Sequence, residues 1–197
     1  MNQENQEDYL TRLLPHRLNA LTIAALMLEY ETMWKEPQPM EIRVNGTLQF
    51  DGTTAMFSNP IFEVGVLHAR SLLEFIGLKV LAGELVQMEL PRRNNDDAGI
   101  EMIKGPTGSL RMVTPEEAAS VFPSDPKSAR EALVQVVIAA HKGVAHASKS
   151  YFANPADAEQ IRFALLLTQK LVELFVYSPL GRERPPVPIQ AWAHLSG

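Results

Sequence analysis

Two short polar signatures lie inside otherwise apolar helical stretches and carry the residue types that do chemistry. The first is HARSLLEF at residues 68–75, and the second is HKGVAH at residues 141–146. A histidine titrates near neutral pH and suits proton transfer, while a guanidinium binds carboxylates and phosphates. A buried charge without a partner is costly, so we expect the two signatures to meet in the folded chain. The candidate residues are His68, Arg70, Glu74, His141, Lys142 and His146.

Helical geometry divides the first signature between two flanks of one helix. Arg70 and Glu74 are four residues apart and can pair directly. At about 100° per residue, His68 falls on the opposite flank. In the second signature, Lys142 and His146 share a flank, from which His146 can reach Arg70 or Glu74 across the helix interface.

A structural interpretation of each residue stands beside the chemical one and is favoured. Buried polar groups are usually only satisfied, which makes His68 and His146 hydrogen-bonded packing residues. Arg70 and Glu74 then form a structural ion pair. His141 falls near the centre of the apolar stripe of its helix, which indicates a core or interface histidine. On this interpretation, His68, Glu74 and His141 belong to a polar network.

The motifs of metal and cofactor sites are missing. The chain has no cysteine, which removes disulfides, thiolate zinc sites and cysteine nucleophiles. No HExxH or ExxH spacing occurs, so we predict no metal site. The segment at 105–108 lacks the Lys-Ser/Thr of a phosphate-binding loop, and no Gly-x-Ser-x-Gly elbow occurs. We therefore predict no cofactor.

The composition is ordinary for a soluble globular protein. The chain has 197 residues, of which 46% are hydrophobic and 21% charged. Its net charge of −5 gives no global attraction to nucleic acid or to an anionic membrane. The acidic start is unlike a secretory signal, and no apolar run approaches the length of a transmembrane helix. These features favour a single domain over residues 1–197, placed in the cytoplasm and away from membranes.

Hydrophobic periodicity predicts the elements that must position the candidate residues. Pro15 is expected to open the first long helix, and Asn59-Pro60 the second. Four long helices joined by short or medium connections imply an all-α antiparallel four-helix bundle. The expected helices cover about residues 15–35, 60–82, 126–151 and 155–178.

Two elaborations on this bundle are expected. Asn45-Gly46 stands between alternating apolar residues and indicates a small β-hairpin within 40–57, with irregular coil as the alternative. Residues 91–113 are polar and rich in glycine and proline, which predicts a long middle loop. Thr114-Pro-Glu-Glu117 is typical of a capping box that starts a short helix.

The two signatures together resemble a known family. HARSLLEF, followed about 70 residues later by KGVAH, resembles an uncharacterised bacterial branch of the HEPN-like helical proteins, over residues 60–178. The resemblance implies a helical bundle, frequently dimeric, and in many members a ribonuclease or an RNA-binding protein. The active motif of the family is an arginine followed, four to six residues later, by a histidine. Upstream of His146 stand Ala140, His141 and Lys142, so Arg70 of the neighbouring helix would supply the guanidinium.

Three functions therefore stay open. The leading prediction is an interaction or structural module with a buried polar network, and the absent arginine before His146 favours it. The alternative is a HEPN-type RNA-binding protein or ribonuclease of toxin–antitoxin or phage-defence systems. Its catalytic residues would be His146, Arg70 and Lys142, in a cleft at a homodimer interface. The third is a small-molecule-binding bundle with residues 84–113 as a lid. Partners are thus a second copy, a protein or RNA, and the sequence leaves open whether the chain is an enzyme.

Overall fold

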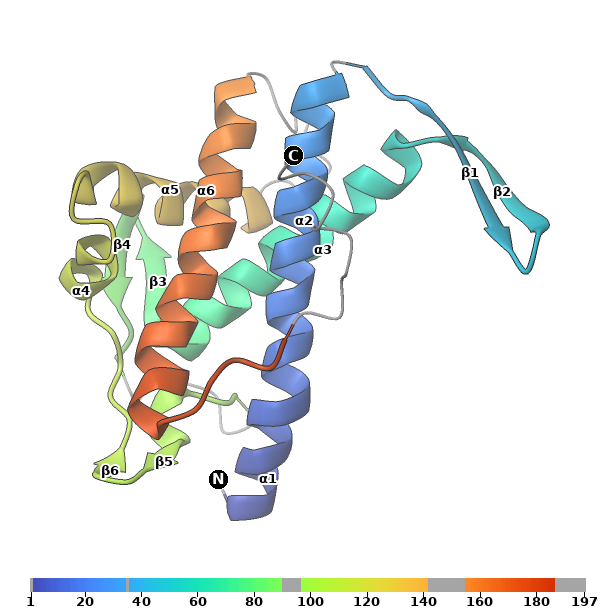
Figure 1. Cartoon of the computed structure of the whole chain (residues 1–197). Coiled ribbons are helices and arrows are strands. Elements are labelled where there is room, and N and C mark those ends of the chain that lie inside the picture. The colour runs from blue at the N-terminus through green and yellow to red at the C-terminus, as the bar shows by residue number, and fades with distance from the viewer. Residues whose placement is uncertain (1, 35, 90–96, 142–154, 187–197) are drawn as a thin grey trace.

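The computed structural model describes residues 2–34, 36–89, 97–141 and 155–186 (Figure 1). Its α-helices are α1 (Gln3–Asp8), α2 (Leu14–Trp34), α3 (Ala55–Phe75), α4 (Pro115–Ser120), α5 (Pro126–Ala139) and α6 (Pro155–Val172). Strands within these residues form three two-stranded antiparallel sheets: β1 (Pro39–Val44) with β2 (Thr47–Thr53), β3 (Leu78–Leu81) with β4 (Glu84–Gln87), and β5 (Lys104–Gly105) with β6 (Gly108–Ser109). The all-α prediction is therefore wrong, because the chain has mixed helical and strand character.

The first long helix extends further toward the N-terminus than predicted. α1, the π-helical segment η1 (Tyr9–Leu13) and α2 follow one another as one continuous rod (Figure 1). Proline cannot donate a backbone hydrogen bond, and the Leu14 N–H binds the Tyr9 carbonyl, five residues back. The wider turn directly before Pro15 lets the rod contain the proline, so Pro15 does not open the helix.

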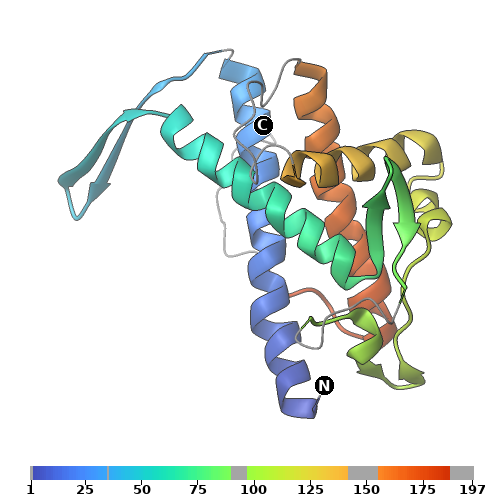
Figure 2. The ribbon, with the colours of Figure 1, turned by 180° about the vertical axis from the view of Figure 1, so that it is seen from behind.

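The hairpin predicted around Asn45-Gly46 is present as β1 and β2. Its turn residues have positive φ, 50° for Asn45 and 79° for Gly46, as a two-residue hairpin loop of this kind requires. The register pairs Ile42 with Phe50 and Arg43 with Leu48, which places an irregularity between them. Two opposite views show the hairpin projecting from the body, joined to it only through the ends of α2 and α3 (Figure 1 and Figure 2).

α3 both begins and ends before the helix predicted over 60–82. It starts at Ala55, so Pro60 lies inside it and not at its first position. It stops at Phe75, because Gly77 adopts a φ of 95°, and such a left-handed residue ends a helix.

The chain after α3 forms strands where a helical extension and a long loop were predicted. Val80 continued the helical spacing of apolar residues, yet it pairs with Leu85 across β3 and β4. Ala82 and Gly83 make the turn, both at positive φ. In the middle segment, a short 3₁₀ helix, η3 (Ile100–Met102), precedes the β5–β6 pair. The long middle loop is therefore partly structured.

The capping box predicted for α4 is confirmed. The Thr114 side chain accepts from the Glu117 N–H, and the Glu117 carboxylate accepts from the Thr114 N–H at 3.0 Å. Hydrogen bonds from Arg111 and from the Thr114 backbone lower the pKa of Glu117 to about 2. Glu117 therefore stays ionised and holds the start of α4 at all but very acid pH.

The helices do not form an antiparallel four-helix bundle. α2 and α6 lie side by side and antiparallel, while α3 and α5 run obliquely across them (Figure 1 and Figure 2). α5 is α-helical as far as Ala139, and the last part of the helix predicted over 126–151 lies outside the described residues. The four elements share one buried core, with Leu21 of α2, Leu72 of α3, Leu133 of α5 and Leu165 of α6 fully buried.

A close crossing of α2 and α3 explains part of this geometry. Gly65 of α3 lies directly against Ala24 of α2, where a side chain on the glycine would clash with the alanine methyl group. The missing side chain lets the two helix backbones approach closely. The obliquely crossing α3 is thereby fixed on the rod, and its C-terminal half lies beside the start of α2.

α6 continues through the π-helical segment η5 (Glu173–Tyr177) and the 3₁₀ turn η6 (Ser178–Leu180). By length and apolarity alone, Asp157–Leu180 could cross a membrane, but half of its most apolar window is buried inside the molecule. The Tyr177 hydroxyl donates to the Leu10 carbonyl at 2.9 Å, which joins the end of this helix to the N-terminal rod. The segment is therefore accounted for as a core helix.

Candidate functional site

The first candidate group is a polar cluster on one flank of α3. Arg70 Nε donates to Glu74 Oε1 at 2.8 Å, as predicted from their spacing along the helix. The other side of the guanidinium faces α5, where Arg70 Nη1 lies 3.4 Å from His141 Nδ1. The structure thus brings the first signature and His141 together through Arg70.

This cluster lies at the surface and is not a buried network. The side chains of Arg70 and Glu74 are 31% and 39% exposed, and His141 is exposed. The expected core or interface position of His141 is therefore not observed within this chain. Water competes for such charges, so the cluster adds little to stability.

His68 belongs to a different group, on the opposite flank of α3. Its ring contacts the His16 ring of α2 edge to face, with centroids 5.7 Å apart. Burial lowers the pKa of His68, and the positive potential of Arg17 and of His16 lowers it further. Of the predicted network of His68, Glu74 and His141, Glu74 and His141 both contact Arg70, whereas His68 faces α2.

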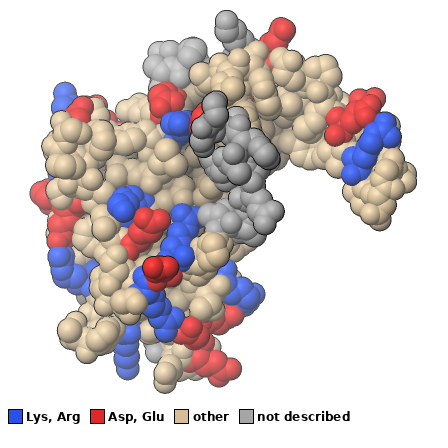
Figure 3. Space-filling view, in the orientation of Figure 1, with Lys and Arg blue, Asp and Glu red and all other residues tan. Residues whose placement is uncertain are grey.

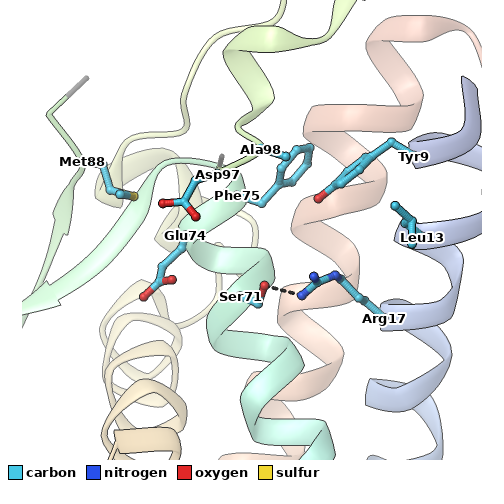
Figure 4. Close-up of a pocket in the computed structure, with 9 residues that line it drawn as sticks. All are labelled: Tyr9, Leu13, Arg17, Ser71, Glu74, Phe75, Met88, Asp97 and Ala98. Atoms are coloured by element: carbon cyan, nitrogen blue, oxygen red, sulfur yellow. Dashed lines mark hydrogen bonds between the residues drawn. The ribbon is translucent and has the colours of Figure 1, made fainter. Parts of the chain in front are cut away.

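A pocket of about 390 Å³ opens between the start of α2 and the end of α3 (Figure 4). Arg17 reaches across from α2, and its Nη1 donates to the Ser71 hydroxyl on α3. The rings of Tyr9 and Phe75 lie 5.0 Å apart and form an apolar wall. The lining residues are Tyr9, Leu13, Arg17, Ser71, Glu74, Phe75, Met88, Asp97 and Ala98.

The charges of the pocket lie on opposite walls. Arg17 stands on the wall formed by α2, while Glu74 and Asp97 lie on the far side of Ser71 (Figure 4). Met88, Asp97 and Ala98 come from the segment 84–113, which was predicted as a lid in the small-molecule hypothesis. This segment therefore contributes one wall of the pocket. Arg17 and Tyr9 were missed by sequence reasoning, because they lie on a helix without a recognisable motif.

A more deeply buried polar network lies elsewhere, between α2, α6 and the chain after α6. The Thr22 hydroxyl donates to Gln169 Oε1 at 2.9 Å, and Arg184 donates to the same oxygen at 2.7 Å. Gln169 is only 7% exposed. Glu173 lies 3.7 Å from the Arg184 guanidinium. The sequence signal for this network was a glutamine inside the apolar arc of α6. Arg184 stands in a proline-rich stretch, and no hydrophobic periodicity there predicts that it packs against α2 and α6.

Among the described residues, apolar side chains are left uncovered on the hairpin and between α2 and α3. Val44 and Leu48 near the tip of the β1–β2 hairpin are 54% and 43% exposed. A groove of about 230 Å³ between α2 and α3 is lined only by apolar residues, namely Ala20, Ile23, Pro60, Ile61 and Val64. In the space-filling view, the hairpin projects sideways beyond the body, and the surface leading to it is mostly uncharged (Figure 3).

No metal centre is found in the part of the chain that the structure describes. No three histidine or carboxylate side chains there are placed to hold an ion. Glu74 and His141 are both side chains that can act as a general acid or base, and both contact Arg70. Glu74 lines the pocket described above but His141 does not, so this pocket does not bring the two groups to one substrate.

The remaining members of the HEPN-like site lie outside the described residues. Lys142 and His146 belong to the segment 142–154, so their distances to Arg70 are not defined. The resemblance and the ribonuclease alternative stay predictions. Comparison with family models, with curated proteins and with solved structures finds no match.

Proposed function

We propose that this chain is an interaction module that forms a homodimer through its β1–β2 hairpin. The single observation that supports the proposal is the hairpin itself, an arm that carries exposed apolar side chains away from the body. An isolated two-stranded hairpin is marginally stable in water. An arm of this kind therefore gains stability from a surface that covers it.

A second copy of the chain is the occupant that fits this arm. The groove of Ala20, Ile23, Pro60, Ile61 and Val64 has an entirely apolar lining, which matches Val44 and Leu48 of the arm. The first residue of α3 that lines this groove is Pro60, between one and two helical turns after α3 starts at Ala55. A two-fold axis lets each arm enter the groove of the other copy, so both uncovered surfaces are satisfied at once.

The arm also exposes the backbone edges of two strands. Unpaired N–H and C=O groups on such edges readily pair with another chain. Arg43 and Glu41 form an ion pair at 3.0 Å on β1, and a charged pair on an edge strand opposes open-ended pairing. A closed dimer is therefore favoured over fibres.

The test is the mass of the protein in solution, measured by light scattering or sedimentation. We expect the wild-type chain to be a dimer and the double variant Val44→Ser with Leu48→Ser to be a monomer with an unchanged circular dichroism spectrum. The matched control is Leu81→Ser, which removes an apolar side chain that is 58% exposed in β3. This control should stay dimeric. A monomeric wild-type chain, or a dimer that survives the double variant, contradicts the proposal.

We also propose that the module acts in the cytoplasm and binds no membrane. The absence of cysteine suits a reducing compartment, and the apolar helix Asp157–Leu180 packs in the core. Fractionation of cells that express the chain tests the location. Recovery in the membrane fraction after a salt wash contradicts it.

A further inference from the structure

We propose that the pocket between α2 and α3 binds a small organic carboxylate with an apolar body, which Arg17 and Ser71 hold by its charged end. The proposal is independent of the dimer, because the pocket lies at the start of α2 and the end of α3, away from the hairpin. It rests on three features of the pocket: an arginine that forms no ion pair with a described residue, a matching volume and an apolar wall.

Among the described residues, no carboxylate neutralises the charge of Arg17. Its contact among the described residues is the hydrogen bond to the Ser71 hydroxyl, and it takes part in no ion pair there. Arg12, five residues earlier on the same rod, pairs with Asp8 at 2.7 Å instead. A guanidinium has five N–H donors in a fixed fork that fits a carboxylate, so most of the binding capacity of Arg17 is unused.

Arg17 is the positive charge on its wall of the pocket. Its effect reaches His68, whose pKa is lowered by burial first and then by the charge of Arg17. Because the lowered pKa keeps the His68 ring neutral near neutral pH, His68 adds no second positive charge beside Arg17. A half-buried guanidinium is stabilised by an anion, because the anion offsets its charge in a site of reduced dielectric.

The rest of the pocket restricts which anion fits. Its volume of about 390 Å³ lies in the range of small-molecule sites. The Tyr9–Phe75 wall and Leu13 suit a flat apolar group. Arg17 is a single positive charge and neutralises one negative charge, so a dianion would keep a second charge unpaired beside the apolar wall. A monoanionic carboxylate therefore fits better than a phosphate dianion or a polyanion such as RNA.

Benzoate is a suitable probe, with benzamide as its neutral analogue and phenyl phosphate as the dianion. Calorimetric titration of the full chain should show benzoate binding, and benzamide and phenyl phosphate binding at least roughly tenfold more weakly. Arg17→Gln should weaken benzoate binding by roughly tenfold or more. Arg12→Gln removes the same charge outside the pocket and should leave the affinity unchanged.

Thermal unfolding of each variant shows whether it is folded, and Arg17→Lys gives a second arm if Arg17→Gln is not. Lysine keeps the charge but loses the fork, so Arg17→Lys should bind benzoate more weakly than wild type. The proposal is overturned if benzoate does not bind, or if benzamide binds as well. Equal losses in Arg12→Gln and Arg17→Gln, or tighter binding of phenyl phosphate, also overturn it. None of these outcomes bears on the dimer, whose test is the mass of the protein.

Discussion

His68 and Arg70 are separated by one residue, yet they serve different neighbours. Arg70 faces α5 and meets His141, while His68 faces α2 and meets His16. The spacing along one helix was enough to predict this division and the Arg70–Glu74 pair. It could not reveal Arg17, because the partner of a helix flank depends on which other helix crosses it, and that depends on long-range packing.

The position of His68 makes the molecule sensitive to acid. Burial and the neighbouring Arg17 and His16 lower the pKa of His68 below its ordinary value of 6.5. The unfolded chain therefore binds a proton on this ring more readily than the folded chain. Stability contributed by neutral His68 is present above about pH 6.5 and is lost as the pH falls below that value.

We expect His68→Gln to flatten the fall in melting temperature between about pH 7.5 and pH 5.5, because glutamine takes up no proton. Thermal unfolding followed by circular dichroism at several pH values measures this slope. His141→Gln is the control, since His141 is exposed and contacts Arg70, on the side of α3 opposite to His68. The explanation fails if His68→Gln keeps the wild-type slope, or if both variants change it equally.

At the scale of elements, the crossing of α2 and α3 depends on one glycine. A glycine inside a helix normally costs about 1 kcal/mol relative to alanine, so Gly→Ala usually stabilises. Gly65→Ala should instead lower the free energy of unfolding by about 1–3 kcal/mol, because its methyl group meets Ala24. The change is read from the midpoint of urea unfolding.

Moving the methyl group from one helix to the other provides the control. The double variant Ala24→Gly with Gly65→Ala keeps one methyl group at the crossing and one glycine in the pair of helices. It should recover most of the lost stability, which appears as a favourable coupling in a double-mutant cycle. A double variant no more stable than Gly65→Ala alone would show that the clash is not what limits this position.

Sequence patterns predicted the elements unevenly, for identifiable reasons. Asn45-Gly46 fixed the hairpin and Thr114 the start of α4, because turn and cap chemistry is local. The β3–β4 pair was missed, since Val80 fits a helical stripe as well as it fits a strand. The positive φ of Gly77 decides between helix and strand here, and the presence of a glycine in the sequence does not by itself predict a positive φ.

At the scale of the whole molecule, the proposed dimer makes stability depend on protein concentration. Association through the β1–β2 arm binds the folded state only, so the melting temperature should rise with concentration. Differential scanning calorimetry over a wide concentration range measures the rise. The double variant Val44→Ser with Leu48→Ser should melt at a temperature that dilution does not change. A wild-type melting temperature independent of concentration would count against assembly through the arm.

The global arrangement was the least predictable level. Four amphipathic stretches are compatible with many crossings, and the antiparallel bundle was predicted from the short or medium connections between them. The oblique course of α3 across α2 depends on the close contact at Gly65, and α3 ends early at Phe75. Neither periodicity nor composition encodes these two features. The pocket with Arg17 exists only because of that course, so no motif search would have found it.

The link between Arg184 and Thr22 has a consequence for how the protein is made. These residues are separated by 162 positions, and Arg184 donates to the Thr22 hydroxyl at 3.2 Å. While the ribosome is still adding residues, α2 has emerged but lacks both α6 and this last polar partner. The nascent chain therefore holds one face of its first long helix open until α6 and Arg184 have been made, and a chaperone that binds emerging chains would meet that face first.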